Sequence, residues 1–420
     1  MAPFLDEHRI DSEESIAALD SRGALRSLAT AGAQVREALT LSQDAGIERV
    51  AGGERPRSVL VASLGGSAVV CDVLELLAEP GSPVPVSTRR NVPLPGWVGP
   101  LDLVIAVSQS GRAAGPLALA AEAARRGASL LTVGAPESPL ADVCARARGV
   151  HINVGSGHDG SRTHLWSMLA PVMLAAGHLG LADVTSEVLD AVADRLDERA
   201  EACRPGSESF VNPAKVLAAD LAEGVPVILG DGPLNGVAAV RAASMLARTA
   251  RVPATSGELP DAASQIVACF DGPFTTAYGD LVARLAGSHG PDQEGDDVSV
   301  HSSGRSGGVA AGEPDIFADP YLDPPAGPRL TLLMLRDAVP DPLTPEAGES
   351  EAMTEAVVAS AREAGVRVAE VTAEPGHPLV RLAGQIATTD FAATYLALGL
   401  GLDPAISPRV ADLSERTGHQ

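Results

Sequence analysis

Two apolar runs that end in turns of glycine and serine constrain the fold of this 420-residue chain most strongly. The first run covers residues 58–64, the second covers 103–107, and a helical pattern follows each. Continuous apolar runs of this length, each followed by a helix, are typical of buried parallel strands in βαβ units. In such sheets a ligand binds beyond the carboxyl ends of the strands. The sequence therefore predicts an α/β fold with a crevice at these turns. The turn residues are Gly65, Gly66, Ser67, Ser108, Ser110 and Gly111.

The chemistry of these turns favours an anionic ligand. Glycine lets backbone N–H groups approach a ligand, and the helix that follows adds unpaired N–H groups and a favourable dipole. The serine hydroxyls add neutral donors. A phosphate monoester fits better than a nucleotide, because the chain has no G-x-x-x-x-G-K-[ST] motif and no G-x-G-x-x-G motif follows the first strand. The alternative is that serine and glycine act here only as ordinary caps and turns.

Length and charge limit the possible partners. A chain of 420 residues predicts two domains, and an apolar content of 45% supports full-sized cores. The net charge of −23 argues against nucleic acid and against anionic membrane surfaces. A phosphorylated ligand therefore needs local positive charge. This charge must come from arginine, because Lys215 is the only lysine in the chain.

The pattern along the chain predicts two α/β domains with a mainly parallel sheet in each. Residues 1–23 are expected to be a flexible N-terminus, 24–205 a first domain with a lead-in helix at 27–41, and 206–420 a second domain. Residues 287–329 form an acidic insertion rich in Gly, Ser and Pro, which is expected to be disordered. Further strands are predicted at 84–87, 129–133, 150–154, 225–229, 265–270, 330–335 and 366–372. Helices are predicted at 67–77, 115–126, 139–147, 162–180, 184–202, 213–222, 234–250, 346–364 and 378–400.

Targeting signals and metal motifs are not evident in the sequence. The chain opens without a signal-peptide pattern, and the apolar stretch 165–181 is short for a membrane span, so a cytoplasmic protein is expected. The cysteines are widely spaced in apolar surroundings, which favours buried free thiols and no metal or other cofactor. They are Cys71, Cys144, Cys203 and Cys269.

Several segments together resemble a known family. LGGSA followed by SxSG at the end of a strand resembles the sugar isomerase (SIS) family, which binds phosphosugars through such serines. The order of further segments resembles the bifunctional phosphoglucose/phosphomannose isomerases, which carry two SIS domains in tandem, each with a three-layer αβα arrangement. These segments are SRTHLWSMLAPVMLAAGHLGL, RVPATSGELPD and HPLVRLAGQIATTDFAATYLALGLGLDP. The resemblance implies a phosphorylated sugar as ligand and a homodimer.

The resemblance also implies a catalytic set, most of which this chain lacks. Aldose–ketose interconversion needs a carboxylate base, an acid/base pair that opens the sugar ring and a cation near the developing oxyanion. Arg162 matches the arginine of the resembled isomerases. The base glutamate falls on Arg248 and the histidine on Ser264. The lysine falls on Ser414, and a threonine after SxSG on Ala113.

Replacement residues for the missing chemistry are few. Glu258 is the best surrogate base, and it lies on the same predicted loop as Asp261. His158 and His377 are weaker candidates, because a lone histidine is more often structural or exposed. Arg248 can instead pair with an acidic neighbour or face an anionic ligand.

Three hypotheses follow. The chain is a phosphosugar-binding SIS protein without the standard catalytic set, which acts as a sensor or a regulator in carbohydrate-phosphate metabolism. Alternatively, it is an active isomerase of the glucose-6-phosphate/mannose-6-phosphate type that uses Glu258. In the third hypothesis it is a structural partner with a vestigial crevice. Loss of the base, the histidine and the lysine favours the first hypothesis over the second. Retention of the serines and Arg162 favours both over the third.

Overall fold

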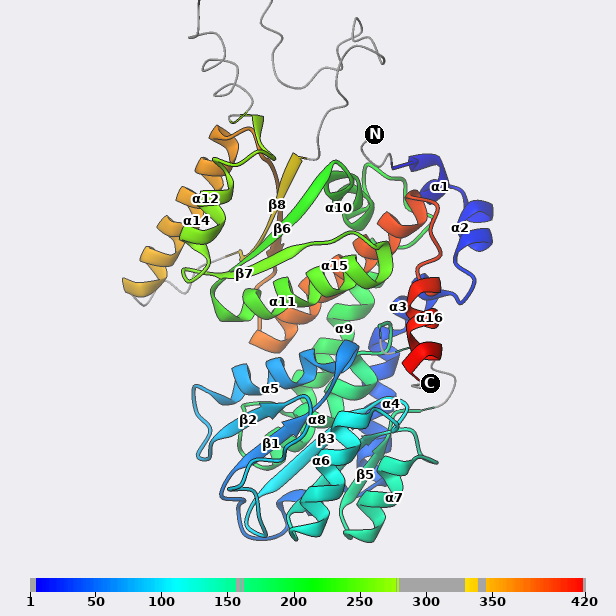
Figure 1. Cartoon of the computed structure of the whole chain (residues 1–420), viewed down its shortest axis with the longest axis vertical. Coiled ribbons are helices and arrows are strands. Elements are labelled where there is room, and N and C mark those ends of the chain that lie inside the picture. Colours follow the sequence, from blue (N-terminus) through cyan, green and yellow to red (C-terminus); the bar gives the residue numbers. More distant parts are fainter. Residues whose placement is uncertain are drawn as a thin grey trace, which may run out of the picture.

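Two parallel β-sheets flanked by helices form the molecule (Figure 1). The computed structural model describes residues 5–155, 160, 162–276, 278, 329–338 and 345–417. The first sheet has the order β2-β1-β3-β4-β5 and the second has the order β7-β6-β8-β9, with every neighbouring pair parallel. The strands of the first sheet are β1 (Val59–Ala62), β2 (Val86–Arg89), β3 (Leu103–Ser108), β4 (Ser129–Gly134) and β5 (Val150–Asn153). Those of the second are β6 (Gly224–Asp231), β7 (Thr255–Leu259), β8 (Arg329–Asp337) and β9 (Arg367–Ala373).

The helices of the first half surround a sheet whose central strands are buried on both faces. One face packs against an apolar cluster that includes α4, α5 and α8, and the other packs against α6 and α7. This arrangement explains why β1 and β3 are apolar without interruption. The helices are α1 (Glu7–Asp11), α2 (Glu13–Leu19), α3 (Ala24–Ala29), α4 (Ala31–Asp44), η1 (Ile47–Ala51), η2 (Gly65–Ser67), α5 (Val69–Ala78), α6 (Ala114–Arg125), α7 (Pro139–Arg146), α8 (Trp166–His178) and α9 (Ser186–Ala202).

The second half repeats the layered arrangement. One face of its sheet packs against α12 and α14, and the other packs against α10, α11 and α15. The cluster on the α10–α11–α15 face is continuous with the one that packs under β1 and β3, so a single apolar core reaches from one sheet to the other. The helices are α10 (Pro213–Ala222), α11 (Gly232–Met245), the π-helical turn η3 (Leu246–Ala250), α12 (Ala263–Cys269), α14 (Pro345–Glu363), α15 (Pro378–Gly399) and α16 (Pro408–Thr417).

The mainly parallel α/β fold predicted from the sequence is confirmed by the sheet topology. Division of the chain into domains at residue 205 stays a prediction. The predicted acidic insertion lies outside the described residues, apart from Arg329, which begins β8. No helix among the described residues is long and apolar enough to cross a membrane.

Three local predictions differ from the structure. Residues 265–270 were expected to form a strand, but 263–269 form α12. Ile266 and the C-cap residue Phe270 are buried four residues apart, and Gln265 is exposed. The segment expected to be a loop around Glu258 contains the edge strand β7.

The N-terminal residues also differ. Within the segment expected to be flexible, residues 7–11 and 13–19 form α1 and α2, whose Ile10 and Ile16 are buried. The Nζ of Lys215 donates a 2.8 Å hydrogen bond to Asp11 at the end of α1. This buried lysine ties the N-terminal helices to α10, which the sequence pattern does not indicate.

Candidate functional site

The site predicted from the sequence lies at the carboxyl edge of the first sheet, where the direction in which the chain adds strands reverses. From β1 the chain continues to β2 on one side and returns to β3 on the other, so the switch point lies between β1 and β3. Ala62 and Ala106 are paired there, and η2 and the turn at 108–111 follow these strands at the carboxyl edge. Ligands of open α/β sheets bind at this position. The topology therefore brings the two glycine–serine turns to one edge, as expected.

The hydroxyls of these turns make local hydrogen bonds. Ser67 is buried, and its Oγ accepts from Ser63 Oγ at 2.7 Å and donates to the carbonyl of Leu64 at 3.1 Å. The Oγ of Ser108 accepts from the N–H of Ala113 at 3.3 Å. Both hydroxyls are thus engaged in local hydrogen bonds within their own turns.

The turn after β3 offers a more accessible hydroxyl. Ser110 is exposed, and its Oγ accepts from the N–H of Arg112 at 3.3 Å. Gly111 has φ +63°, and a Cβ there would collide with the side chain of Ser138. Only glycine fits this position without strain. The glycine holds the turn in the form that leaves Ser110 exposed after β3.

Arg162 connects the first half of the chain to the second. One guanidinium nitrogen donates to the carbonyls of Arg248 and Pro404, at 2.8 and 3.0 Å, and the other donates to the carbonyl of Ala405 at 2.5 Å. Burial and the neighbouring positive charges of Arg251 and Arg22 lower its pKa. Arg162 therefore carries a structural role across the two halves, in addition to the ligand-binding role expected from the sequence.

Arg241 on α11 is a functional candidate that the sequence interpretation missed. Its guanidinium donates to both oxygens of Asp390 on α15, at 3.2 and 2.8 Å, and both side chains are almost fully buried. It also donates to the carbonyls of Gly66 and Arg162, at 3.2 and 2.6 Å. Arg241 thus links the first glycine–serine turn to the core of the second half. Its sequence signal is a charged residue within an apolar helix, which usually needs a buried partner.

Arg248 lies in η3, two turns beyond Arg241. No hydrogen bond or ion pair of its guanidinium is found among the described residues, and no acidic side chain there pairs with it, contrary to one of the sequence expectations. Burial and the charges of Arg162 and Arg241 lower its pKa to about 10. The group remains protonated at neutral pH, so it is a cation without a counterion among the residues that the structure describes.

Glu258 does not lie near this cluster. A Cβ on Gly236 would lie 2.8 Å from Oε2 of Glu258, which places the carboxylate against the N-terminal half of α11. Arg248 lies 12 residues further along, which corresponds to about 18 Å of helix. Burial and the charges of Asp261 and Glu79 raise the pKa of Glu258. Glu79 stands at the C-terminal end of α5, whereas Ser67 lies just before the N-terminus of that helix. The structure does not bring Glu258 together with Arg162 or Ser67.

The remaining catalytic candidates have structural positions or fall outside the description. His377 caps α15: its Nδ1 accepts from the N–H of Leu379 at 3.2 Å and its Nε2 lies 2.8 Å from the carbonyl of Asp183. Ser264 is an exposed residue of α12. His158 lies outside the described residues. Among the described residues, no group of three or more His, Cys, Asp or Glu side chains could hold a metal ion.

These features define an α/β fold of two parallel sheets, each flanked by helices. Solved structures share this fold. A hypothetical protein, TT0462, from Thermus thermophilus matches with a TM-score of 0.60 and 16% identity over 99% of both chains. A protein from Silicibacter pomeroyi DSS-3 proposed to be a phosphosugar isomerase matches with a TM-score of 0.58 and 18% identity, over 91% of this chain and 99% of that one.

Sequence comparison gives a more specific relationship. Residues 210–416 match the family model of the bacterial phospho-glucose isomerase C-terminal SIS domain. A bifunctional phosphoglucose/phosphomannose isomerase from Caldicellulosiruptor bescii is 26% identical over 196 residues, which cover 47% of this chain and 57% of that relative. The second half of the chain is therefore similar to the SIS domain of bacterial phospho-glucose isomerases, and part of the chain is similar to a phosphoglucose/phosphomannose isomerase. The resemblance predicted from the sequence is confirmed, although the match spans little more than half of the relative.

Proposed function

We propose that the crevice between β1 and β3 binds a phosphorylated sugar, and that the chain does not isomerise it. The observation that supports binding most directly is the arginine cluster beside the first turn. Arg162, Arg241 and Arg248 contribute three positive charges, and Asp390 is the carboxylate that the structure pairs with Arg241. This cluster supplies local positive charge in a chain whose net charge is −23. An anionic ligand balances that charge.

The turns supply the second part of a phosphate site. Ser110 offers an exposed hydroxyl at the switch point, and Gly65 and Gly66 leave backbone groups close to the edge of the sheet. Gly66 contacts Arg241 directly through its carbonyl oxygen. A phosphate in this crevice therefore has neutral donors from the turns and a positive potential from the second half of the chain.

The residue at position 248 argues against turnover. Proton transfer between C1 and C2 of an aldose or ketose requires a base, and in the resembled isomerases a glutamate takes this position. A guanidinium with a pKa of about 10 is protonated at pH 7 and cannot accept the proton. Glu258, the surrogate base considered from the sequence, lies at the other end of α11. The proposed role is therefore recognition of a sugar phosphate as a sensor or regulator. The homodimer implied by the resemblance is part of this proposal.

A binding titration tests this proposal. Glucose 6-phosphate, fructose 6-phosphate, mannose 6-phosphate and unphosphorylated glucose are titrated into the protein by calorimetry. We expect at least one phosphosugar to bind and glucose not to bind. Arg248→Gln removes a charge-assisted contact worth about 1.5–3 kcal/mol, so affinity falls by about 10- to 100-fold.

Matched variants locate the site. Ser110→Ala tests the exposed hydroxyl of the turn. Arg125→Gln removes an exposed arginine of α6 that pairs with Glu122, so it changes net charge equally and leaves binding unchanged. Equal loss of affinity in Arg125→Gln and Arg248→Gln would mean that the effect comes from the net charge of the protein and not from a contact with Arg248. Absence of binding by every phosphosugar would favour the structural-partner hypothesis.

A further inference from the structure

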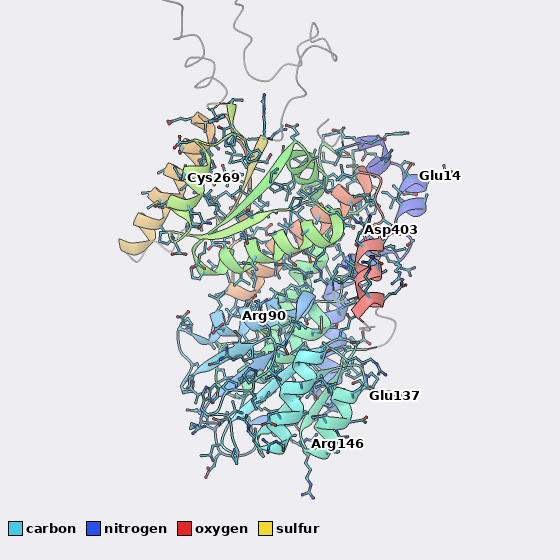
Figure 2. The ribbon with its side chains drawn as sticks, viewed as in Figure 1. Glu14, Arg90, Glu137, Arg146, Cys269 and Asp403 are labelled. Atoms are coloured by element: carbon cyan, nitrogen blue, oxygen red, sulfur yellow. The ribbon has the colours of Figure 1, made fainter. Side chains whose placement is uncertain are left out.

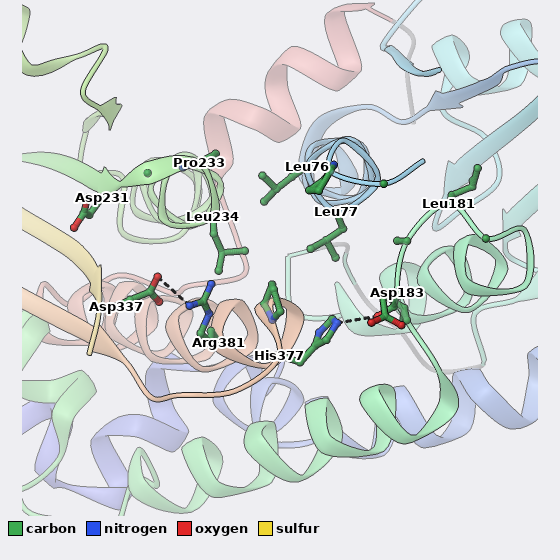
Figure 3. Close-up of a pocket in the computed structure, with 17 residues that line it drawn as sticks. Leu76, Leu77, Leu181, Asp183, Asp231, Pro233, Leu234, Asp337, His377 and Arg381 are labelled. Atoms are coloured by element: carbon green, nitrogen blue, oxygen red, sulfur yellow. Dashed lines mark hydrogen bonds and ion pairs between the residues drawn. The ribbon is translucent and has the colours of Figure 1, made fainter. Parts of the chain in front are cut away.

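A cavity of about 770 Å³ lies at the switch point of the second sheet (Figure 3). From β6 the chain continues to β7 on one side and later returns to β8 on the other, so this switch point lies between β6 and β8. Asp231 ends β6 and Asp337 ends β8, and both line the cavity. Ligands of open α/β sheets bind at this position, and the volume is within the range of small-molecule sites.

The wall of this cavity is apolar and comes from both halves of the chain. Leu76 and Leu77 belong to α5 of the first half, and Leu234 belongs to α11 of the second. Figure 3 shows the two leucines of α5 facing Leu234 across the cavity. Such a wall favours a ligand with an apolar body.

Carboxylates dominate the charge of the lining. Asp183, Asp231 and Asp337 are negative and Arg381 is positive, which gives a formal balance of −2 with neutral His377. His377 accepts through Nδ1 from the N–H of Leu379, so this nitrogen carries no proton. A phosphate or carboxylate ligand is disfavoured here, unlike at the switch point of the first sheet.

Asp231 and Asp337 form the polar end of the cavity. Asp231 stands at the N-terminus of α11, and one of its oxygens accepts from Ser350 Oγ at 2.6 Å. Asp337 lies 3.3 Å from Arg381 through one oxygen, and its other oxygen is buried. Burial and the charge of Asp231 raise the pKa of Asp337, against the effects of Arg381 and a hydrogen bond from Asn235. Each carboxylate favours a cation beside it, and Arg381 pairs with only one of them.

We propose that this cavity binds an unphosphorylated primary amine with an apolar body, whose ammonium group lies between Asp231 and Asp337. Such a ligand brings a positive charge and hydrogen-bond donors to the two carboxylates, and its apolar part covers the leucine wall. This proposal does not depend on phosphosugar binding, because it concerns a different sheet and the opposite charge.

A panel of three probes with the same apolar body tests the assignment. Hexylamine, 1-hexanol and hexanoate differ only in the charged or polar end, and their binding is measured by ligand-observed NMR on the full chain at pH 7.5. We expect hexylamine to bind at least about tenfold more tightly than 1-hexanol, which corresponds to about 1.4 kcal/mol, and hexanoate to bind most weakly. Equal binding of hexylamine and 1-hexanol would overturn the proposal, and so would preferred binding of hexanoate.

Variants locate the ammonium. Asp231→Asn and Asp337→Asn each keep the side-chain shape and remove one charge, so each is expected to weaken hexylamine by about fivefold or more. Asp142→Asn changes an exposed carboxylate on α7 and leaves binding unchanged. If Asp337→Asn does not fold because it loses its pair with Arg381, Asp231→Asn decides alone. Hexylamine binding that is the same in Asp231→Asn as in the parent contradicts the site.

Discussion

Replacement of Arg241 by methionine tests the structural link between the first turn and the second half. Arg241 and Asp390 are exposed by only 2% and 4%, and Arg241→Met leaves Asp390 buried without its counterion. Loss of one partner of a buried pair costs about 3–5 kcal/mol. This is a large part of the roughly 5–15 kcal/mol that stabilises a typical domain. Urea unfolding followed by circular dichroism measures the loss as a lower midpoint.

The pH dependence of this loss identifies its cause. Burial raises the pKa of Asp390 above its unfolded value, even with Arg241 beside it. A raised folded-state pKa means that the ionised carboxylate is penalised in the folded protein, and the penalty disappears as the carboxyl becomes protonated. Arg241→Met removes the charge that opposes this shift, so the pKa of Asp390 rises further. The deficit in unfolding free energy is therefore expected to be largest near pH 8 and to shrink toward pH 5.

Two variants complete this test. Arg241→Met with Asp390→Leu removes both charges, and we expect it to regain part of the lost stability. Arg36→Met breaks an exposed pair with Asp194 and Asp197 and is expected to cost less than about 1 kcal/mol. The reasoning is refuted if Arg241→Met is as stable as Arg36→Met, or if its deficit is the same at pH 5 and pH 8.

Three further predictions concern other parts of the chain. Lys215→Met removes a buried ammonium that donates hydrogen bonds to Asp11 and to two backbone carbonyls. We therefore expect the free energy of unfolding, measured with urea, to fall by about 3 kcal/mol. A fall of less than about 1 kcal/mol contradicts this role. Ellman's reagent is expected to modify one thiol in the folded protein, that of Cys269, which is exposed on α12 (Figure 2). Cys71 is expected not to react, because burial raises its pKa to about 12. Cys269→Ser should abolish the fast reaction, and persistence of that reaction would locate it at another thiol. Glu258→Gln is expected to change phosphosugar affinity by less than about twofold, because the carboxylate lies about 18 Å along α11 from Arg248; a larger loss in calorimetry places it in the site.

The sequence predicts the central strands well because burial on both faces leaves a simple signal. β1, β3 and β4 are short apolar runs with glycine or serine after them. β7 lacks this signal, since it is an edge strand of the sequence TSGEL and carries one fully buried residue. The run that forms α12 is ambiguous, because short apolar runs fit a strand or a buried helix face equally.

The candidate site was predictable only where it depends on local turns. Ser108, Ser110 and Gly111 follow a recognisable strand, so the sequence places them at the edge of the sheet. The contacts of Arg241 with Gly66 and Asp390 span 175 and 149 residues, and no local pattern encodes them. Cys269 was expected to be buried but is exposed, and no local pattern in the sequence encodes this exposure either.

Proton exchange in D₂O tests the central claim most directly. The protein is incubated with glucose 6-phosphate, fructose 6-phosphate and mannose 6-phosphate, and NMR follows both line broadening, which reports binding, and deuterium at C1 or C2, which reports ene-diolate chemistry. Our account predicts broadening of at least one phosphosugar, which weakens in Ser110→Ala, and no incorporation of deuterium. Deuterium at C1 or C2 that disappears in Glu258→Gln would contradict it, because the chain would then be an isomerase with a rebuilt site.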